Sequence, residues 1–138
     1  MKSMKQLVVV AIFAALACTA LHAQSADLRA TIPFNFHAGD RLMPAGEYVI
    51  HEQGMLVVLR EADSGRLAPI LMTIGVVSSN PREAGLDFSH YGNEYFLKAI
   101  WSPVSGYGRQ FLQTAREREV AKRGIVPVQA EVTLASTK

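Results

Sequence analysis

The segment Leu86–Trp101 constrains the fold more than any other part of the sequence. Its centre, Gly92-Asn93, has the composition of a two-residue hairpin turn with glycine first, and the twist of this turn suits two antiparallel strands. A slip of one residue would bury charged side chains, so the sequence predicts one register. In that register the opposite residues are Tyr91 and Glu94, His90 and Tyr95, Phe88 and Leu97, and Leu86 and Ala99, with an ion pair of Asp87 and Lys98 on the other face.

Alternation of apolar and polar side chains recurs along much of the chain and predicts further antiparallel strands. Residues 27–36 alternate in this way, and Pro33 within them predicts a sheet edge or a bulge because proline donates no hydrogen bond. Residues 66–77 predict another long strand, which Pro69 bends or confines to an edge. Pro44-Ala45-Gly46 between these segments predicts a turn that joins two strands.

A second hairpin is predicted over residues 47–60, with Gln53-Gly54 as its two-residue turn. In this register Glu47 lies opposite Arg60, and the two form an ion pair at the open end of the hairpin. Four apolar side chains then share one face and are expected in the core: Tyr48, Ile50, Val57 and Leu59.

A short helix is predicted over residues 115–123. Thr114 and Glu117 have the spacing of a capping box, and Gly124 stands where a helix would end. The segment before the helix, residues 102–109, contains one proline and two glycines and is predicted to be a loop.

These elements predict a single all-β domain over residues 24–124, folded as an antiparallel sandwich or a partly closed barrel. We expect about six to eight short strands, with the one C-terminal helix covering an edge or an end. Alternation resumes in residues 125–138, which predicts either a last strand or a mobile tail. A mature chain of about 115 residues buries roughly two thirds of the surface that its unfolded form exposes, which suffices for one core.

Residues 1–23 have the organisation of a secretory signal peptide. Lys2 and Lys5 form a basic start, residues 7–17 are apolar, and small residues precede a cleavage site after Ala23. We therefore expect this segment to be removed and the protein to be exported to the periplasm or the cell exterior. A membrane-spanning helix needs roughly 20 apolar residues, and this run is shorter.

Cys18 is the only cysteine in the chain and allows an alternative. The residues Ala15-Leu16-Ala17-Cys18 resemble a bacterial lipoprotein box, so lipidation at Cys18 competes with cleavage after Ala23. Cleavage after Ala23 removes the cysteine and leaves the mature domain without a disulfide, a thiolate or a cysteine-based metal site.

Loss of the signal segment also changes the charge of the chain. Of 14 basic residues, Lys2 and Lys5 are removed, which leaves 12 to balance the 12 acidic residues. A neutral domain lacks the basic footprint that binding to nucleic acid or to an anionic membrane requires. We expect no nucleic-acid partner, and contact with a membrane only during export or after lipidation at Cys18.

Two stretches of the mature chain form a recognisable pattern. The first joins ATIPFNF at 30–36 to MPAGEY at 43–48, and the second joins FSHYGNEYFL at 88–97 to Ile100-Trp101. With Gly108-Arg109 and the charged helix, the pattern resembles an uncharacterised family of small exported, mainly β proteins of environmental bacteria. That family has an acidic residue and a proline after the arginine, where this chain has Gln110-Phe111-Leu112. The resemblance implies an exported β domain and no functional residues.

The sequence contains no recognisable catalytic or metal-binding motif. His37, His51 and His90 lack the spacing of metal ligands on one helix or hairpin. Ser105 lies in Pro-Val-Ser-Gly rather than in the Gly-x-Ser-x-Gly of a nucleophile elbow. We therefore expect no metal, no cofactor and no catalytic residue. A small hydrolase built on paired carboxylates is the least favoured function.

Aromatic side chains are the one indication of a binding surface. Four of them fall within seventeen residues: Tyr91, Tyr95, Trp101 and Tyr107. Exposed tyrosine and tryptophan on a sheet stack on sugars or on partner proteins. The predicted register places Tyr95 and Trp101 on the apolar face, whereas Tyr91 beside a turn and Tyr107 in a glycine loop are surface candidates. The ligand-binding candidates are Tyr91, Trp101, Tyr107 and, as a polar contact, Arg109.

The predicted function is non-catalytic. We expect a binding or structural module of the bacterial envelope, whose partner is an envelope protein or a glycan. The alternative is a carrier of a small apolar ligand in a cavity enclosed by the strands. A carrier requires a cavity of at least ~300 Å³ with apolar walls, whereas a packed sandwich has no such void.

Overall fold

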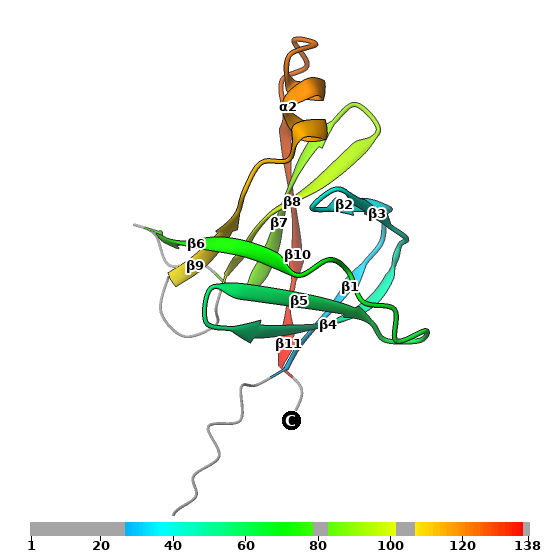
Figure 1. The fold of residues 1–138 in the computed structure, drawn as a ribbon, viewed down its shortest axis with the longest axis vertical. Coiled ribbons are helices and arrows are strands. Elements are labelled where there is room, and N and C mark those ends of the chain that lie inside the picture. Colours follow the sequence, from blue (N-terminus) through cyan, green and yellow to red (C-terminus); the bar gives the residue numbers. More distant parts are fainter. Residues whose placement is uncertain (1–26, 79–82, 102–106, 137–138) are drawn as a thin grey trace, which may run out of the picture.

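A computed structural model describes residues 27–78, 83–101 and 107–136 of the chain. The predicted signal segment 1–23, with Cys18, lies outside these residues, as does the 102–106 part of the predicted loop. The described residues form eleven strands and one helix (Figure 1). The strands are β1 (Leu28–Ile32), β2 (Phe36–Ala38), β3 (Arg41–Met43), β4 (Gly46–Gln53), β5 (Leu56–Glu61), β6 (Leu71–Val77), β7 (Gly85–Tyr91), β8 (Glu94–Trp101), β9 (Tyr107–Phe111), β10 (Val128–Thr133) and β11 (Ala135–Ser136), and the helix is α2 (Ala115–Ala121).

The strands form one strongly bent sheet with the order β10-β7-β8-β9-β6-β5-β4-β1-β11. The sheet has two halves, β10-β7-β8-β9 and β5-β4-β1-β11. Strand β6 joins them, because its first two residues pair with β5 and its later residues pair with β9. The short β2–β3 ladder lies off this path and joins β8 through one parallel bridge. The predicted all-β class is confirmed, and the arrangement is sandwich-like rather than a closed barrel. The strand number exceeds the prediction because several strands have only two or three residues.

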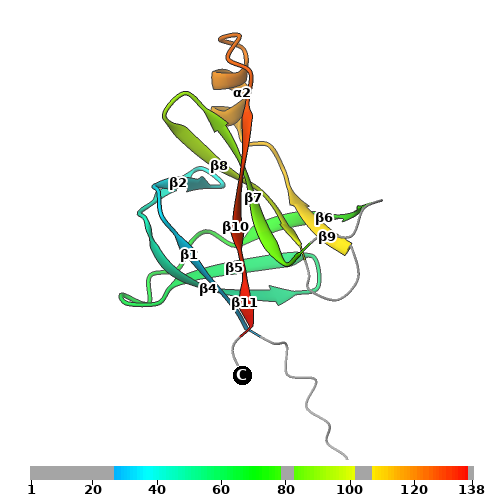
Figure 2. The same ribbon diagram turned by 180° about the vertical axis from the view of Figure 1, so that it is seen from behind.

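The C-terminal residues join the two ends of the sheet. Strand β10 pairs with β7 at one end, and after the single residue Leu134 the chain pairs as β11 with β1 at the other end. In Figure 2, which views the molecule from behind, this long segment crosses in front of both halves of the sheet. The side chains of Val132 and Leu134 are buried, so alternation after the helix reflects a face turned toward the core.

The core lies between the two halves of the sheet. The four side chains predicted to share one face of the β4–β5 hairpin, Tyr48, Ile50, Val57 and Leu59, are all fully buried. The Tyr48 hydroxyl donates a hydrogen bond of 2.6 Å to the carbonyl oxygen of Pro44. Burial raises the pKa of Tyr48 to about 12. Phe36 packs edge-to-face on both Tyr48 and Phe88, which links the core side chains of the two halves.

The register of the β4–β5 hairpin differs from the prediction by two residues. Its turn is Gly54-Met55, and Gly54 takes the first loop position with a φ of 59°. Glycine is favoured at that position because it adopts positive φ without strain. A shift of two residues keeps every side chain on its predicted face. It separates Glu47 from Arg60, however, and Glu47 instead forms an ion pair of 2.8 Å with Arg29 on β1.

The β7–β8 hairpin keeps the predicted Gly92-Asn93 turn, with Gly92 at a φ of 61°. The predicted pairs from Tyr91–Glu94 to Phe88–Leu97 are also present. Beyond Phe88 a bulge leaves Lys98 unpaired in the ladder, so Asp87 lies opposite Ala99 and Leu86 opposite Ile100. The predicted Asp87–Lys98 ion pair is therefore wrong, because Asp87 is buried and hydrogen-bonded to the Trp101 indole, whereas Lys98 is exposed.

Prolines shorten two of the predicted strands. The strand predicted over residues 27–36 stops at Ile32, before Pro33, and the chain resumes pairing as β2 from Phe36. The strand predicted over residues 66–77 begins only at Leu71, after Pro69. In both places the proline, which has no backbone N–H to donate, interrupts the strand pairing instead of confining the strand to a sheet edge.

The helix begins as predicted and ends two residues early. The Thr114 hydroxyl accepts a hydrogen bond of 3.1 Å from the backbone N–H of Glu117, and Gly124 follows the last turn with a φ of 76°. Before the helix, residues 107–111 form β9, which corrects the prediction that the loop extends to Arg109. Strand β9 fits between β6 and β8 and completes one half of the sheet.

Candidate functional site

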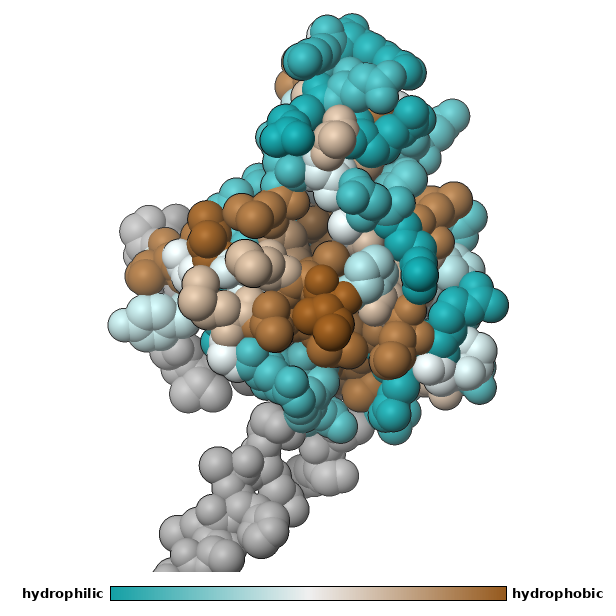
Figure 3. Space-filling model, viewed as in Figure 1, coloured by the Kyte–Doolittle hydropathy of each residue, from teal (hydrophilic) through white to brown (hydrophobic). Residues whose placement is uncertain are grey.

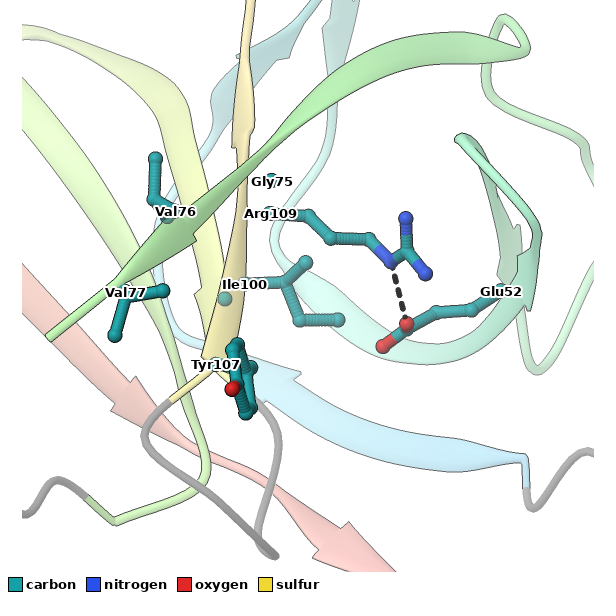
Figure 4. Close-up of a pocket in the computed structure, with 8 residues that line it drawn as sticks. Glu52, Gly75, Val76, Val77, Ile100, Tyr107 and Arg109 are labelled. Atoms are coloured by element: carbon teal, nitrogen blue, oxygen red, sulfur yellow. Dashed lines mark hydrogen bonds and ion pairs between the residues drawn. The ribbon is translucent and has the colours of Figure 1, made fainter.

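The candidate site is a pocket of about 500 Å³ between the two halves of the sheet (Figure 4). Four strands contribute to it, which are β4, β6, β8 and β9. The described residues that line it are Glu52, Gly75, Val76, Val77, Ile100, Tyr107, Gly108 and Arg109.

The pocket exists because β6 leaves β5 after Met72. Both the backbone N–H and the hydroxyl of Thr73 donate to the carbonyl oxygen of Met55, at 2.9 and 2.8 Å, and they hold the chain where the two strands separate. From Thr73 onward β6 pairs with β9, whereas β5 continues beside β4. The gap between the end of β4 and the second half of β6 is the pocket.

Arg109 and Glu52 face one another across this gap. The Arg109 Nε donates a hydrogen bond of 2.9 Å to the Glu52 Oε2, and the side chains are 31% and 29% exposed. Within the part of the chain that the structure describes, Glu52 is the only hydrogen-bonding partner of the Arg109 side chain. Cross-strand pairing places Ile100 and Gly75 on either side of Arg109, so all three positions share the face that lines the pocket.

Glycine occupies the two pocket positions 75 and 108 for different reasons. A Cβ at Gly108 would lie 2.6 Å from the Cε3 atom of Trp101, so the indole ring excludes any side chain there. A Cβ at Gly75 would have no atom within 4 Å, and its backbone does not require glycine. Glycine in a strand interior weakens the strand, so Gly75 keeps space open at a cost in stability.

The structure brings together two of the four residues that the sequence indicated. Tyr107, at the start of β9, is 60% exposed and lies at the edge of the pocket near Arg109 (Figure 4). Trp101 is buried behind the pocket wall, where its Nε1 donates a hydrogen bond of 2.8 Å to the Asp87 Oδ2. It supports Gly108 and does not line the pocket.

Tyr91 lies elsewhere and corrects the expectation of a surface residue. It is only 5% exposed and packs at the other end of the hairpin, beneath α2. There it hydrogen-bonds Glu117, a carboxyl that is itself buried and that also hydrogen-bonds Gln113 and Ser89. Burial is the main cause that raises the pKa of both Glu117 and Tyr91. This cluster anchors the helix on the hairpin and presents no open binding surface.

Neither Glu52 nor Gly75 was identified from the sequence as a pocket residue, although the pattern around each of them is unusual for a strand. Glu52 continues the alternation of Tyr48 and Ile50 and therefore stands on the buried face, where an acidic residue is unusual. Gly75 is an isolated glycine inside a strand pattern, which indicates a bulge or a place that other atoms approach closely.

An apolar patch covers the outward face of β5 and β6 (Figure 3). Leu56 and Met72 are cross-strand partners within it, and Ile70 and Ile74 extend it along the chain; all four are exposed. Patches of this kind mark surfaces that contact other molecules. The patch lacks the polar side chains that fix the orientation of a ligand, so the pocket is the stronger candidate for specific binding.

The histidines lie apart, each with a local partner. The His51 Nδ1 is 2.7 Å from the Asp27 Oδ1, His37 stacks on Phe96, and His90 stacks on Tyr95. No group of three histidine, cysteine, aspartate or glutamate side chains that could hold a metal ion occurs among residues 27–78, 83–101 and 107–136. In the same residues, no helix is long and apolar enough to cross a membrane.

The chain was compared with known proteins by sequence and by structure. No protein-family model, no curated protein and no solved structure matches it.

Proposed function

We propose that the protein is an exported, non-catalytic binding module of the bacterial envelope and that its binding site is the pocket between β4, β6 and β9. The main support is the combination of Tyr107, Arg109 and Glu52 around a space of about 500 Å³. Ligand pockets of roughly 300–1,000 Å³ with apolar walls and a few polar groups are typical of small-molecule sites. Gly75 adds support, because the fold accepts a side chain there and the sequence leaves the space empty.

The composition of the pocket favours binding over catalysis. Among its described lining residues, the chemically active groups are the Arg109–Glu52 pair and the Tyr107 phenol. A nucleophilic mechanism requires a hydroxyl or thiol with an adjacent base. Paired-carboxylate hydrolysis requires a second acid on the other side of the substrate. The described lining offers neither arrangement, so the proposal assigns no catalytic residue.

A carrier of a small apolar ligand is the second candidate. The volume of the pocket exceeds the ~300 Å³ that such a ligand needs, and Val76, Val77 and Ile100 give it apolar walls. An apolar ligand would, however, cover the half-buried Arg109–Glu52 pair without replacing its contacts with water, which is unfavourable. The polar pair therefore makes the carrier the weaker candidate.

Export rests on residues 1–23 and places the module in the periplasm or outside the cell. Lipidation at Cys18 would instead tether it to a membrane. A pocket that holds part of an envelope glycan or of an envelope protein is consistent with either location.

The experiment that tests the proposal blocks the pocket without disturbing the fold. Gly75→Leu places a side chain in the open space, and Ile74→Leu changes the neighbouring, outward-facing position as a matched control. A broad library of glycans and small metabolites is screened by thermal shift. We expect at least one ligand that raises the Tm of the wild type and of Ile74→Leu and leaves Gly75→Leu unchanged. If every ligand stabilises Gly75→Leu equally, or if none binds, the proposed function is wrong.

A further inference from the structure

The polar groups of the pocket offer donors and acceptors side by side. The Arg109 guanidinium has five N–H groups, and the bond to Glu52 uses the one on Nε. The second carboxylate oxygen of Glu52 adds an acceptor beside these donors. Since one positive and one negative group meet at 2.9 Å, the charge of the site is balanced. A ligand that matches it must both accept and donate hydrogen bonds.

This balance disfavours two classes of ligand. An anion would gain Arg109 but would lie close to the Glu52 carboxylate, and like charges at short distance repel. A wholly apolar ligand would remove water from both charged groups and give them no new partner. Neighbouring hydroxyl groups satisfy both sides, because each hydroxyl donates one hydrogen bond and accepts others.

Tyr107 supplies the remaining feature. Its ring is exposed and lies at the edge of the same pocket, close to the face that carries Ile100 (Figure 4). An aromatic ring gives a flat apolar surface on which the C–H face of a sugar ring packs. The absence of a side chain at Gly75 leaves open space on the face that carries Arg109 and Ile100.

We infer that the pocket binds a neutral, hydroxyl-rich ligand of the saccharide class, with Tyr107 stacking on the sugar ring and the Arg109–Glu52 pair binding adjacent hydroxyl groups. The inference rests on the proposed function and names its ligand. A neutral peptide segment also donates and accepts hydrogen bonds. It is the less favoured occupant, because the pocket pairs its polar groups with one exposed aromatic face instead of with a row of alternating side-chain pockets.

The test follows backbone amide signals of the ¹⁵N-labelled protein during titration. The favoured probes are neutral oligosaccharides that differ in linkage and stereochemistry, among them cellotriose, maltotriose and chitotriose. The comparison probes are glucuronate as the anion, N-phenyl-1-naphthylamine as the apolar molecule, and an acetylated and amidated Gly-Ser tetrapeptide. We expect a neutral oligosaccharide to shift the signals of Gly75, Gly108 and Arg109 with saturation.

Three variants test the assigned roles. Tyr107→Ala should weaken saccharide binding by about fivefold or more, whereas Tyr107→Phe keeps the ring and should bind within about twofold of the wild type. Glu52→Gln leaves the Arg109 charge unbalanced and should shift the preference toward glucuronate. The double variant Glu52→Leu with Arg109→Leu should lose saccharide binding and bind N-phenyl-1-naphthylamine more tightly, a change of preference that a merely structural role would not produce.

The outcomes separate this inference from the proposed function. Binding of glucuronate, the naphthylamine or the peptide at the pocket of the wild type, without any neutral saccharide, overturns the inference and leaves a ligand-binding pocket in place. Saccharide binding that Gly75→Leu does not block also overturns it, because the sugar then binds elsewhere. If no probe shifts the pocket signals, the saccharide assignment is wrong, and the blocked-pocket library screen decides the proposed function.

Discussion

Trp101 and Asp87 are joined by a buried hydrogen bond of 2.8 Å between the indole Nε1 and the carboxylate Oδ2. Asp87 pairs with Ala99 next to the bulge at Lys98, and Trp101 follows three residues later on β8; both side chains are buried. The bond therefore links the register of β7 and β8 to the ring that packs against Gly108 and the wall of the pocket.

Trp101→Phe removes the donor to Asp87 and part of the ring. Hydrogen bonds to charged groups contribute about 1.5–3 kcal/mol, and the smaller ring adds a packing loss, so we expect the free energy of unfolding to fall by roughly 2 kcal/mol or more. Tyr107→Phe is the control, because it removes an exposed hydroxyl and should change stability by no more than about 0.5 kcal/mol. Urea unfolding measures both variants. Equal stability of the two would contradict the buried role of Trp101.

Substitution by alanine should change the stability of the protein in opposite directions at Gly75 and Gly108. Gly108→Ala places a Cβ 2.6 Å from Trp101 and 2.9 Å from the Ile100 carbonyl oxygen, which should destabilise the protein by about 1–3 kcal/mol. Gly75→Ala meets no atom within 4 Å and should stabilise it by about 0.5–1 kcal/mol. Thermal unfolding of both variants gives the two signs directly. Destabilisation by Gly75→Ala would show that the space at this position is already filled.

Much of the fold was predictable because period-two alternation and turn chemistry act locally. The burial of Tyr48 and Ile50 and the Gly92-Asn93 turn follow from such local patterns. The turn of the first hairpin was misplaced at Gln53-Gly54, although the rule that puts glycine first in a two-residue loop selects Gly54-Met55. The face of each strand was still correct, because the error was two residues.

The parts that could not be predicted depend on contacts between distant strands. The bulge at Lys98 arises where Asp87 reaches Trp101, fourteen positions away, and an alternating pattern contains no sign of an extra residue. Arg109 and Glu52 are 57 positions apart and meet only because β6 leaves β5. Tyr107 and Arg109 were recognised from residue type alone. Their shared pocket required the three-dimensional order of the strands.

Export predicts the mass of the mature protein. Cleavage after Ala23 leaves a mature protein that begins at Gln24, whereas lipidation leaves Cys18 as a modified first residue. We expect mass spectrometry of the protein recovered from the periplasm or medium to give the mass of residues 24–138, and we expect Cys18→Ser to change neither its mass nor its location. Retention of Met1 contradicts export. Release of the protein from membranes by Cys18→Ser supports the lipoprotein alternative.

The buried Glu117 predicts how stability changes with pH. Burial raises the pKa of this carboxyl above its ordinary value of 4.5, so the folded state favours the protonated form. The associated stability is fully present below pH 4.5 and is lost as the pH rises through the folded-state pKa. Glu117→Gln keeps a neutral side chain that accepts and donates hydrogen bonds, and it should therefore be more stable than the wild type at pH 7.5 while differing little at pH 4.

The control for this pH dependence lies on the same helix. Glu119 is 60% exposed and pairs with Arg123, so Glu119→Gln should change stability little at either pH. Urea unfolding at pH 4 and pH 7.5 gives the difference between each variant and the wild type. A Glu117→Gln difference that stays constant between the two pH values would mean that the carboxyl has an ordinary pKa beneath α2. A pH-dependent difference that Glu119→Gln lacks assigns the effect to the burial of the Glu117 carboxyl beneath α2.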